Sequence, residues 1–354
     1  MNILFLSFND CENDGRSKDL LDVASKIGTV YKICLGKESK KDRNGLVLST
    51  VGAVKSVLYI KYFLSSFKKI IMDKQIDCIF IDNYHAALPG LLAKLFHRTR
   101  YIIQDSRELY TYASLPSLAG KFLIYCEHQL MRKADVVICA NKYRSYICKG
   151  LYNLFKMPLT YENIHWINEY SDIKSLNNDI RIISTDGLMV NRNLRDFLLS
   201  KKNLAENIKY YLLGDYTEKE YEYAQSLIKK HELKNIFIEQ RLPRVELGNF
   251  LKTCHIGIVK YNFNDMNNIF CASGKIYEFI MMGIPVVTTE QFELKEICEN
   301  YGVGVADNNF ANGINKILDN YGYYVDNVIK FQEIIKNNNA SGTLCKNICQ
   351  MLDK

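Results

Sequence analysis

The chain has 354 residues, of which 48% are hydrophobic and 24% are charged, a balance typical of a soluble globular protein with room for two domains. The formal net charge of +7 is compatible with anionic lipid, a nucleotide diphosphate or nucleic acid, and it does not choose among them. The eleven cysteines lack the spacing of a zinc site or a disulfide framework, so we expect reduced core thiols in a cytosolic protein.

The first half of the chain alternates between apolar runs, which predict buried parallel strands, and amphipathic segments, which predict helices. Strands are predicted at residues 2–8, 30–35, 78–82, 101–104 and 136–139. Helices are predicted at residues 18–27, 54–73, 89–96 and 121–134. The segment 2–8 lacks the basic start of a secretory signal, and no apolar run reaches transmembrane length, so we expect neither feature.

Two residues of this half follow predicted strands at the end where open parallel sheets bind ligands. Gly15 lies in the loop after the first strand, where phosphate or acceptor groups often sit, and His85 follows the strand at 78–82. We assign both to substrate binding. The Gly15 loop lacks the G-x-G-x-x-G pattern, so a nicotinamide dinucleotide site is not predicted.

The segment 54–73 (VKSVLYIKYFLSSFKKIIMD) has an apolar face with lysines elsewhere on its surface. It fits an ordinary amphipathic helix that packs on the sheet. The alternative is a helix that also docks on an anionic membrane through its basic and aromatic residues.

The second half begins a new α/β alternation after a polar stretch. Strands are predicted at residues 182–185, 210–214, 235–239, 255–260, 284–288 and 301–305. Helices are predicted at residues 194–199, 218–231, 246–252, 274–282, 310–318, 325–338 and 344–352, and another is predicted to start in the run from 291 to 297. We therefore expect a first domain at 1–165, a linker at 166–180, a second domain at 181–335 and a final helical segment at 336–354.

The most informative stretch is CASGKIYEFIMMGIPVVTTEQFELKEI, residues 271–297. Ser273 and Gly274 can begin a helix whose free N–H groups attract anions. Lys275 and Glu278 lie three residues apart and project from nearly the same face. Such a helix tip suits a phosphorylated, hydroxylated ligand, although a solvated Lys/Glu pair on a surface helix explains the same residues.

This stretch resembles the donor-site motif K-x-x-E-F/Y-x-x-x-G-x-P-V-V of retaining GT-B glycosyltransferases of the family 4 type. The segment Asp105-Ser106-Arg107-Glu108-Leu109-Tyr110 is similar to the D-S-H-E-L-Y segment of the same family. The resemblance covers most of the chain in order. It implies an α/β fold of the GT-B type, with two doubly wound Rossmann-like domains facing across a cleft and a last helix that crosses back to the first domain.

The resemblance also implies a donor site for a nucleotide-diphosphate sugar, bound as a UDP- or GDP-sugar and not as a tightly held cofactor. Glu278 would hold the ribose, and Arg192 with Lys275 would stabilise the leaving diphosphate, which makes these three the expected catalytic residues. The full expected donor-binding set is Gly187, Arg192, Gly214, Arg241, Ser273, Gly274, Lys275 and Glu278. No metal site is expected.

On the acceptor side, the resemblance adds Asp105, Arg107 and Glu108 to Gly15 and His85 as expected substrate-binding residues. Glu108 is also explained as a helix-start residue favoured by the helix dipole. Family members build bacterial surface polysaccharides such as capsules, often on lipid-linked acceptors. We therefore expect a cytoplasmic protein with peripheral contact to the inner face of an anionic membrane, and no nucleic-acid partner.

Three positions depart from the family pattern. The family usually has histidine at Arg107 and arginine at Leu188, and it often has a glutamate at Phe270 that touches the donor sugar. Two alternatives stay open. One is a nucleotide-sugar epimerase of the same fold, and the other, which these departures leave open, is a non-catalytic partner subunit that keeps the fold.

Overall fold

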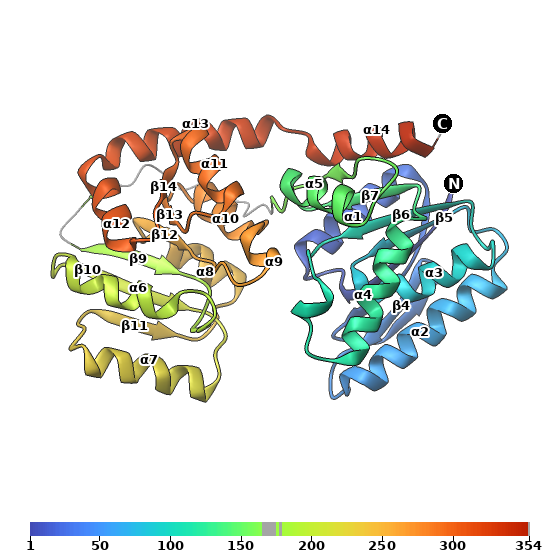
Figure 1. Cartoon of the computed structure of the whole chain (residues 1–354), viewed down its shortest axis with the longest axis horizontal. Helices are drawn as coiled ribbons and strands as arrows, with labels where there is room; N and C mark the ends of the chain where they lie inside the picture. The colour runs from blue at the N-terminus through green and yellow to red at the C-terminus, as the bar shows by residue number, and fades with distance from the viewer. Residues whose placement is uncertain (165–174, 177–178, 353–354) are drawn as a thin grey trace. The chain divides into compact units, whose positions relative to one another are not determined.

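The computed structural model describes residues 1–164, 175–176 and 179–352. Most of the predicted linker, 166–180, lies outside the described residues. The chain divides into two compact units, Met1–Glu162 with Asn339–Lys354, and Asn163–Asn338 (Figure 1).

The first unit is built on an eight-stranded sheet with the order β3-β4-β2-β1-β5-β6-β7-β8. Every neighbouring pair is parallel except β3 and β4. The strands are β1 (Asn2–Asp10), β2 (Thr29–Gly36), β3 (Lys40–Asp42), β4 (Gly45–Ser49), β5 (Cys78–Asp82), β6 (Tyr101–Ser106), β7 (Val136–Cys139) and β8 (Leu159–Thr160). The helices are α1 (Gly15–Ile27), α2 (Lys55–Met72), α3 (Ala87–Leu95), α4 (Leu118–Met131), α5 (Lys142–Leu151) and α14 (Ala340–Leu352).

Side chains of β1 show why this unit has three layers. Leu4 and Leu6 enter one hydrophobic core, which they share with α2, α3 and α4. Ile3 and Phe5 point the other way, into a core shared with α1 and α14. Because successive residues of a strand face opposite sides, a strand covered on both faces must be apolar throughout, as the segment 2–8 nearly is.

The second unit has a six-stranded, all-parallel sheet with the order β11-β10-β9-β12-β13-β14. The strands are β9 (Ile180–Ser184), β10 (Ile208–Leu213), β11 (Ile236–Glu239), β12 (Ile256–Val259), β13 (Val286–Thr288) and β14 (Gly304–Ala306). The helices are α6 (Leu194–Ser200), α7 (Glu218–Lys230), α8 (Arg244–Leu251), α9 (Met266–Ile269), α10 (Gly274–Met281), α11 (Phe292–Tyr301), α12 (Phe310–Asp319) and α13 (Tyr321–Asn337).

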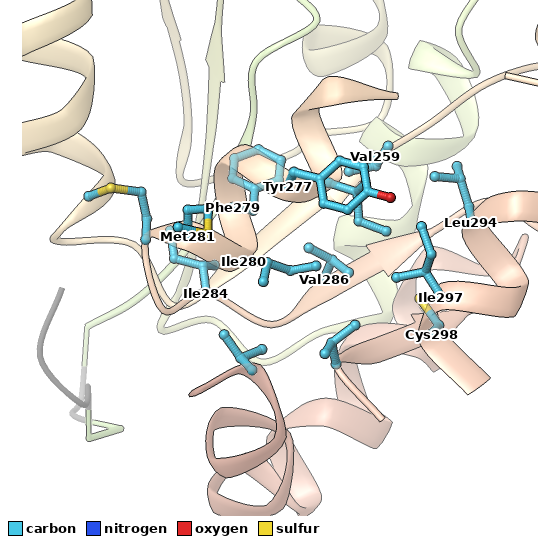
Figure 2. Close-up of a cluster of buried hydrophobic side chains, with 14 of the residues drawn as sticks. Val259, Tyr277, Phe279, Ile280, Met281, Ile284, Val286, Leu294, Ile297 and Cys298 are labelled. Atoms are coloured by element: carbon cyan, nitrogen blue, oxygen red, sulfur yellow. The ribbon is translucent and has the colours of Figure 1, made fainter. Parts of the chain in front are cut away.

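A hydrophobic core lies on each face of the second sheet. Val286 faces the core that includes α10 and α11, and Figure 2 shows it beside Phe279, Ile280 and Ile297. Val287 faces the opposite core, with α6 and α12. Both units are therefore Rossmann-like layers of helix, parallel sheet and helix, as predicted for the fold class.

Several boundaries differ from the predictions. The short strands β3, β4 and β8 and the helices α5 and α9 were not predicted. Gly15 is the first residue of α1 and not part of a loop, because Asp14 caps the helix by accepting a hydrogen bond from the Ser17 N–H. Tyr301 ends α11, and the last strand starts only at Gly304. Within the described residues, no helix combines the length and the apolar character needed to cross a membrane.

The order of strands fixes where each unit can hold a ligand. In the second sheet β9 is first in the chain, and β10 and β12 flank it on opposite sides. Connections from β9 and β12 thus leave in different directions, which makes the carboxyl ends of these strands the switch point where open α/β sheets bind ligands. In the first sheet β1 lies between β2 and β5 in the same way.

Candidate functional site

An ion cluster centred on one carboxylate lies at this switch point of the second unit. Asp186 follows β9, and its Oδ1 lies 2.8 Å from Lys275 Nζ and 3.0 Å from Arg192 Nη1. Its Oδ2 lies 3.2 Å from Lys260 Nζ, at the end of β12. Three cations surround a single anion, so the cluster carries two positive charges in excess.

Burial separates the cluster into an inner and an outer layer. The side chains of Lys260 and Asp186 are 0% and 1% exposed. The side chains of Arg192 and Lys275 are 24% and 28% exposed. Only the outer two cations can therefore contact a ligand.

The charges of the cluster favour the ionised forms of Asp186 and Lys275, whereas burial opposes the ionised form of Lys260. Burial would raise the pKa of Asp186, but Lys260, Lys275 and Arg192 outweigh it and hold that pKa far below its usual range. Burial would lower the pKa of Lys275, but Asp186 and Tyr261 raise it above its usual value. For Lys260 burial prevails and lowers the pKa, although Asp186 opposes the shift.

Two glycines allow the loops after β9 and β10 to touch beside the cluster. Gly187 has a φ of +61°, and a Cβ there would lie 2.2 Å from the Asp215 carbonyl oxygen. Gly214 has a φ of +141°, and a Cβ there would lie 2.6 Å from the Gly187 nitrogen. Other residues would be strained at both positions. Of the three predicted donor-site glycines, Gly187 and Gly214 are thus required by the backbone, whatever their contact with a ligand.

Tyr261, directly after Lys260, supports the outer layer. The Arg192 guanidinium lies over the Tyr261 ring, 4.5 Å from its centroid. Asn193, with a φ of +52°, donates a hydrogen bond of 2.8 Å from its side-chain amide to the Tyr261 carbonyl oxygen. The aromatic ring and the Asp186 carboxylate together fix the position of Arg192.

The N-terminus of α10 adds hydrogen-bond donors next to Lys275. Ser273 is the N-cap residue, but its side chain caps no N–H group. Its hydroxyl is buried and has no hydrogen-bond partner among the described residues. Gly274 begins the helix. A buried hydroxyl beside free N–H groups and a lysine suits an anionic oxygen.

The remaining predicted donor-site residues occupy different settings. Glu278 lies on α10 one turn after Lys275, is half-buried, and makes no hydrogen bond or ion pair with the described residues. Arg241 follows β11 and is 75% exposed, with Asp215 at 3.4 Å. Of the predicted set, the structure gathers Gly187, Arg192, Gly214 and Lys275 around the ends of β9 and β10, while Arg241 lies on the surface.

Asp186 and Lys260 were not predicted as site residues. The available signal was a charged residue at the carboxyl end of each of two apolar strands. Leu188, where the related family has arginine, is fully buried in a hydrophobic core. Phe270, where that family often has glutamate, stacks on Phe292 with ring centroids 5.2 Å apart.

The first unit has its own ion network at the carboxyl ends of its strands. Arg16 on α1 donates from Nε to Asp105 at 2.9 Å and bonds the other carboxylate oxygen through Nη2. Arg107 binds Asp14 at 2.7 and 2.9 Å and lies 3.4 Å from Asp82. Asp105 and Arg107 are therefore already engaged with neighbouring side chains.

Burial and the arginine charges oppose each other in this network, and a different one prevails at each carboxylate. Burial raises the pKa of Asp105 despite the opposing charge of Arg16. For Asp14 burial is outweighed by Arg107, which lowers the pKa to about 2. Glu108 is less engaged, since its carboxylate lies 3.5 Å from Arg144 and is 32% exposed.

His85 lies after β5, in a short 3₁₀ turn (Tyr84–Ala86). Its ring packs against Tyr84 and Phe8, with centroids 3.9 and 5.3 Å away. Nδ1 is buried and has no partner among the described residues. Burial, followed by the charge of Lys55, lowers the pKa of His85 to about 4. The imidazole is therefore neutral at physiological pH.

The two units together have the GT-B fold of glycosyltransferases, as comparison with solved structures shows. HepE of Anabaena, in complex with UDP and glucose, matches with a TM-score of 0.72 at 14% identity over 100% of both chains. Sucrose-phosphate synthase from Thermosynechococcus elongatus matches with a TM-score of 0.71 at 12% identity over 99% of both chains. A trehalose-6-phosphate structure from E. coli, bound with UDP-2-fluoro glucose, matches with a TM-score of 0.70 at 11% identity over 100% of this chain and 99% of that one.

No protein-family model matches the sequence. No curated protein matches it either. At 11–14% identity the structural likeness establishes the fold, and the activity has to be argued from the site.

Proposed function

We propose that this chain is a retaining glycosyltransferase that moves a sugar from a UDP- or GDP-sugar to a hydroxyl acceptor without a bound metal. The observation that carries the proposal is the excess of positive charge around Asp186, beside the Ser273 hydroxyl, which has no hydrogen-bond partner in the described part of the chain. A nucleoside diphosphate is the anion that fits such a site. Similar folds recorded with UDP, glucose or UDP-2-fluoro glucose support this choice.

Each residue of the donor site has a role in the proposal. Arg192 and Lys275 bind the diphosphate and stabilise the charge that develops on it as the sugar leaves. Ser273 and the first N–H groups of α10 donate to phosphate oxygens. Glu278 accepts hydrogen bonds from the ribose hydroxyls. Gly187 and Gly214 keep Cβ atoms out of the donor loops.

The chemical step balances without a protein nucleophile. The bond between the anomeric carbon and the phosphate oxygen breaks, and a bond from that carbon to the acceptor oxygen forms on the same face. The acceptor proton passes to the leaving phosphate. Arg192 and Lys275 favour this step because they interact more strongly with the separated diphosphate than with the intact donor.

The acceptor is proposed to bind at the carboxyl edge of the first sheet, near Gly15, His85 and Glu108. His85 is neutral, and its buried Nδ1 has no hydrogen-bond partner among the residues that the structure describes, so it can exchange a hydrogen bond with an acceptor hydroxyl. Asp105 and Arg107 are proposed to shape this edge through their ion pairs.

Calorimetric titration of the whole protein with UDP, GDP and ADP tests the donor site. We expect micromolar to millimolar binding of UDP or GDP, and a marked loss of affinity in Lys275→Ala and Glu278→Ala. Unchanged affinity in both variants would overturn the assignment. Binding without transfer from a labelled sugar nucleotide would favour a non-catalytic subunit, and release of an epimerised free sugar would favour an epimerase.

A lipid-linked acceptor is proposed as well, reached from the cytoplasmic face of a membrane during surface polysaccharide synthesis. Support comes from the outer face of α2, which carries lysines, no acidic residue and an exposed apolar stripe. The exposed apolar residues on and before α2 are Val51, Val54, Val57, Ile60, Leu64 and Met72. Lysines beside exposed apolar side chains suit an anionic bilayer.

Co-sedimentation with vesicles tests the membrane contact. We expect binding to phosphatidylcholine vesicles that contain phosphatidylglycerol, and weaker binding to pure phosphatidylcholine. Ile60→Ser combined with Leu64→Ser should reduce it, whereas Val245→Ser, which changes an exposed residue of the second unit, should not. Equal binding of both variants would contradict the role of α2.

A further inference from the structure

The buried part of the Asp186 cluster has a role of its own. We propose that Asp186 is a positioning residue that holds Arg192 and Lys275 in place for a diphosphate, and that Lys260 is the hidden cation that cancels the charge of Asp186. This inference rests on the donor-site function proposed above. It concerns residues that a ligand does not touch, since Asp186 and Lys260 are almost completely buried.

The geometry carries the positioning role. One oxygen of Asp186, Oδ1, accepts from both Lys275 Nζ at 2.8 Å and Arg192 Nη1 at 3.0 Å. Two long side chains from different parts of the fold are thereby tied to a single point. Without that point, Lys275 would sample many rotamers and Arg192 would keep its contact with the Tyr261 ring but lose its carboxylate partner, so a ligand would have to order them when it binds.

Lys260 compensates the negative charge that Asp186 brings to the site. An uncompensated carboxylate would cancel one of the two outer cations and leave a site poorly matched to a diphosphate. Lys260 Nζ lies on the opposite oxygen, Oδ2, at 3.2 Å, and it also donates to Ser184 Oγ at 2.9 Å. Because Lys260 neutralises the Asp186 carboxylate, Arg192 and Lys275 present two full charges to a ligand.

A charge-matched double variant separates positioning from charge. Asp186→Asn with Lys260→Met removes one negative and one positive charge, so the net charge of the cluster stays the same. Removal of both partners also avoids the cost of a lone buried ion. We expect the double variant to have a melting temperature close to that of the wild type. It should bind UDP about tenfold more weakly, because charge-assisted hydrogen bonds to both outer cations are lost.

Uridine and a matched variant serve as controls. Uridine lacks the diphosphate, so its affinity should not change in the double variant, whereas a general structural defect would weaken both ligands. Asp179→Asn removes another carboxylate with two cationic partners, Arg181 at 2.8 Å and Lys209 at 2.9 Å, just before β9. That variant should bind UDP as the wild type does.

The outcomes distinguish this inference from the proposed function. A double variant that binds UDP as tightly as the wild type overturns the inference alone, as does equal weakening of UDP and uridine. A wild type that binds neither UDP, GDP nor pyrophosphate overturns both. Should the double variant not fold, Asp186→Glu keeps the charge and displaces the carboxylate by one methylene; wild-type UDP affinity in that variant overturns the positioning role.

Discussion

Both units place charged side chains at the carboxyl ends of their parallel strands, but the two clusters differ in balance. In the first unit three carboxylates, those of Asp14, Asp82 and Asp105, meet two guanidinium groups, those of Arg16 and Arg107. In the second unit one carboxylate meets three cations. The first cluster has a negative charge in excess, and the second has two positive charges in excess.

The difference shows which cluster is complete without a ligand. In the first unit both guanidinium groups are paired with carboxylates of the same cluster. The cluster therefore stabilises the unit and has little attraction for an anion. In the second unit the outer cations share one acid, and an anionic ligand is the natural further partner. Two similar positions in similar sheets are therefore expected to respond differently to mutation.

The largest effect is expected when the first cluster loses a cation. Arg16→Met leaves Asp105 buried without its partner, so the free energy of unfolding should fall by about 3–5 kcal/mol. Urea unfolding measures the loss. Lys40→Met is the control, because the ion pair of Lys40 with Asp42 is exposed and its removal should have no measurable effect. Equal stability of the two variants would contradict the structural role of the first cluster.

In the second cluster, loss of an outer cation should weaken binding more than folding. Lys275→Ala removes a cation that faces the ligand while Lys260 and Arg192 still neutralise Asp186. UDP affinity should fall by about 1.5–3 kcal/mol, the range for hydrogen bonds to charged groups. Calorimetry gives the affinity, and thermal unfolding gives the stability. A large drop in melting temperature with unchanged UDP affinity would show that the second cluster stabilises the fold and does not bind the ligand, contrary to this prediction.

The pH dependence of stability should reflect His85, next to the first cluster. Its pKa is lowered from 6.5 to about 4 in the folded protein, so the unfolded chain binds its proton first. As pH falls from 6.5 to 4, His85 should cost about 1–3 kcal/mol of stability. His85→Gln should remove that part of the acid sensitivity in urea titrations at pH 7 and pH 5. An identical pH dependence in the variant would show that the imidazole is not desolvated.

The smallest effect is expected at Arg241. Its ion pair with Asp215 is long and exposed, so Arg241→Ala should leave thermal stability unchanged. If Arg241 reaches the donor diphosphate, UDP affinity should fall by about threefold, as for a solvent-exposed charge contact. No change in affinity would remove Arg241 from the donor site.

Sequence patterns predicted the strands and helices that depend on residues close to one another in the sequence. The buried strand at 2–8 and the helix that carries Lys275 and Glu278 follow from local apolar periodicity and helix-end signals. The strands β3 and β8 were missed because they are only three and two residues long and contain polar residues. Such edge strands are defined by their neighbours and not by their own composition.

The ion clusters could not be predicted because their partners are distant in sequence. Asp186 and Lys260 are 74 residues apart, and Arg16 and Asp105 are 89 apart. They meet because β9 pairs with β12, and because α1 packs against the sheet that contains β6. A lysine at the end of an apolar strand was visible in the sequence, but its partner depends on the order of strands in the sheet.

The packing of α14 has a consequence for how the protein is made. Leu344, Ile348 and Leu352 lie in the same core as Leu20 and Phe5 of the first unit, with α14 lying along α1 (Figure 1). During synthesis on the ribosome, the hydrophobic core on this face of the first sheet cannot be completed until residue 352 has emerged. Until then a nascent apolar surface is open to chaperones and to wrong partners, and the first unit to be translated is the last to be finished.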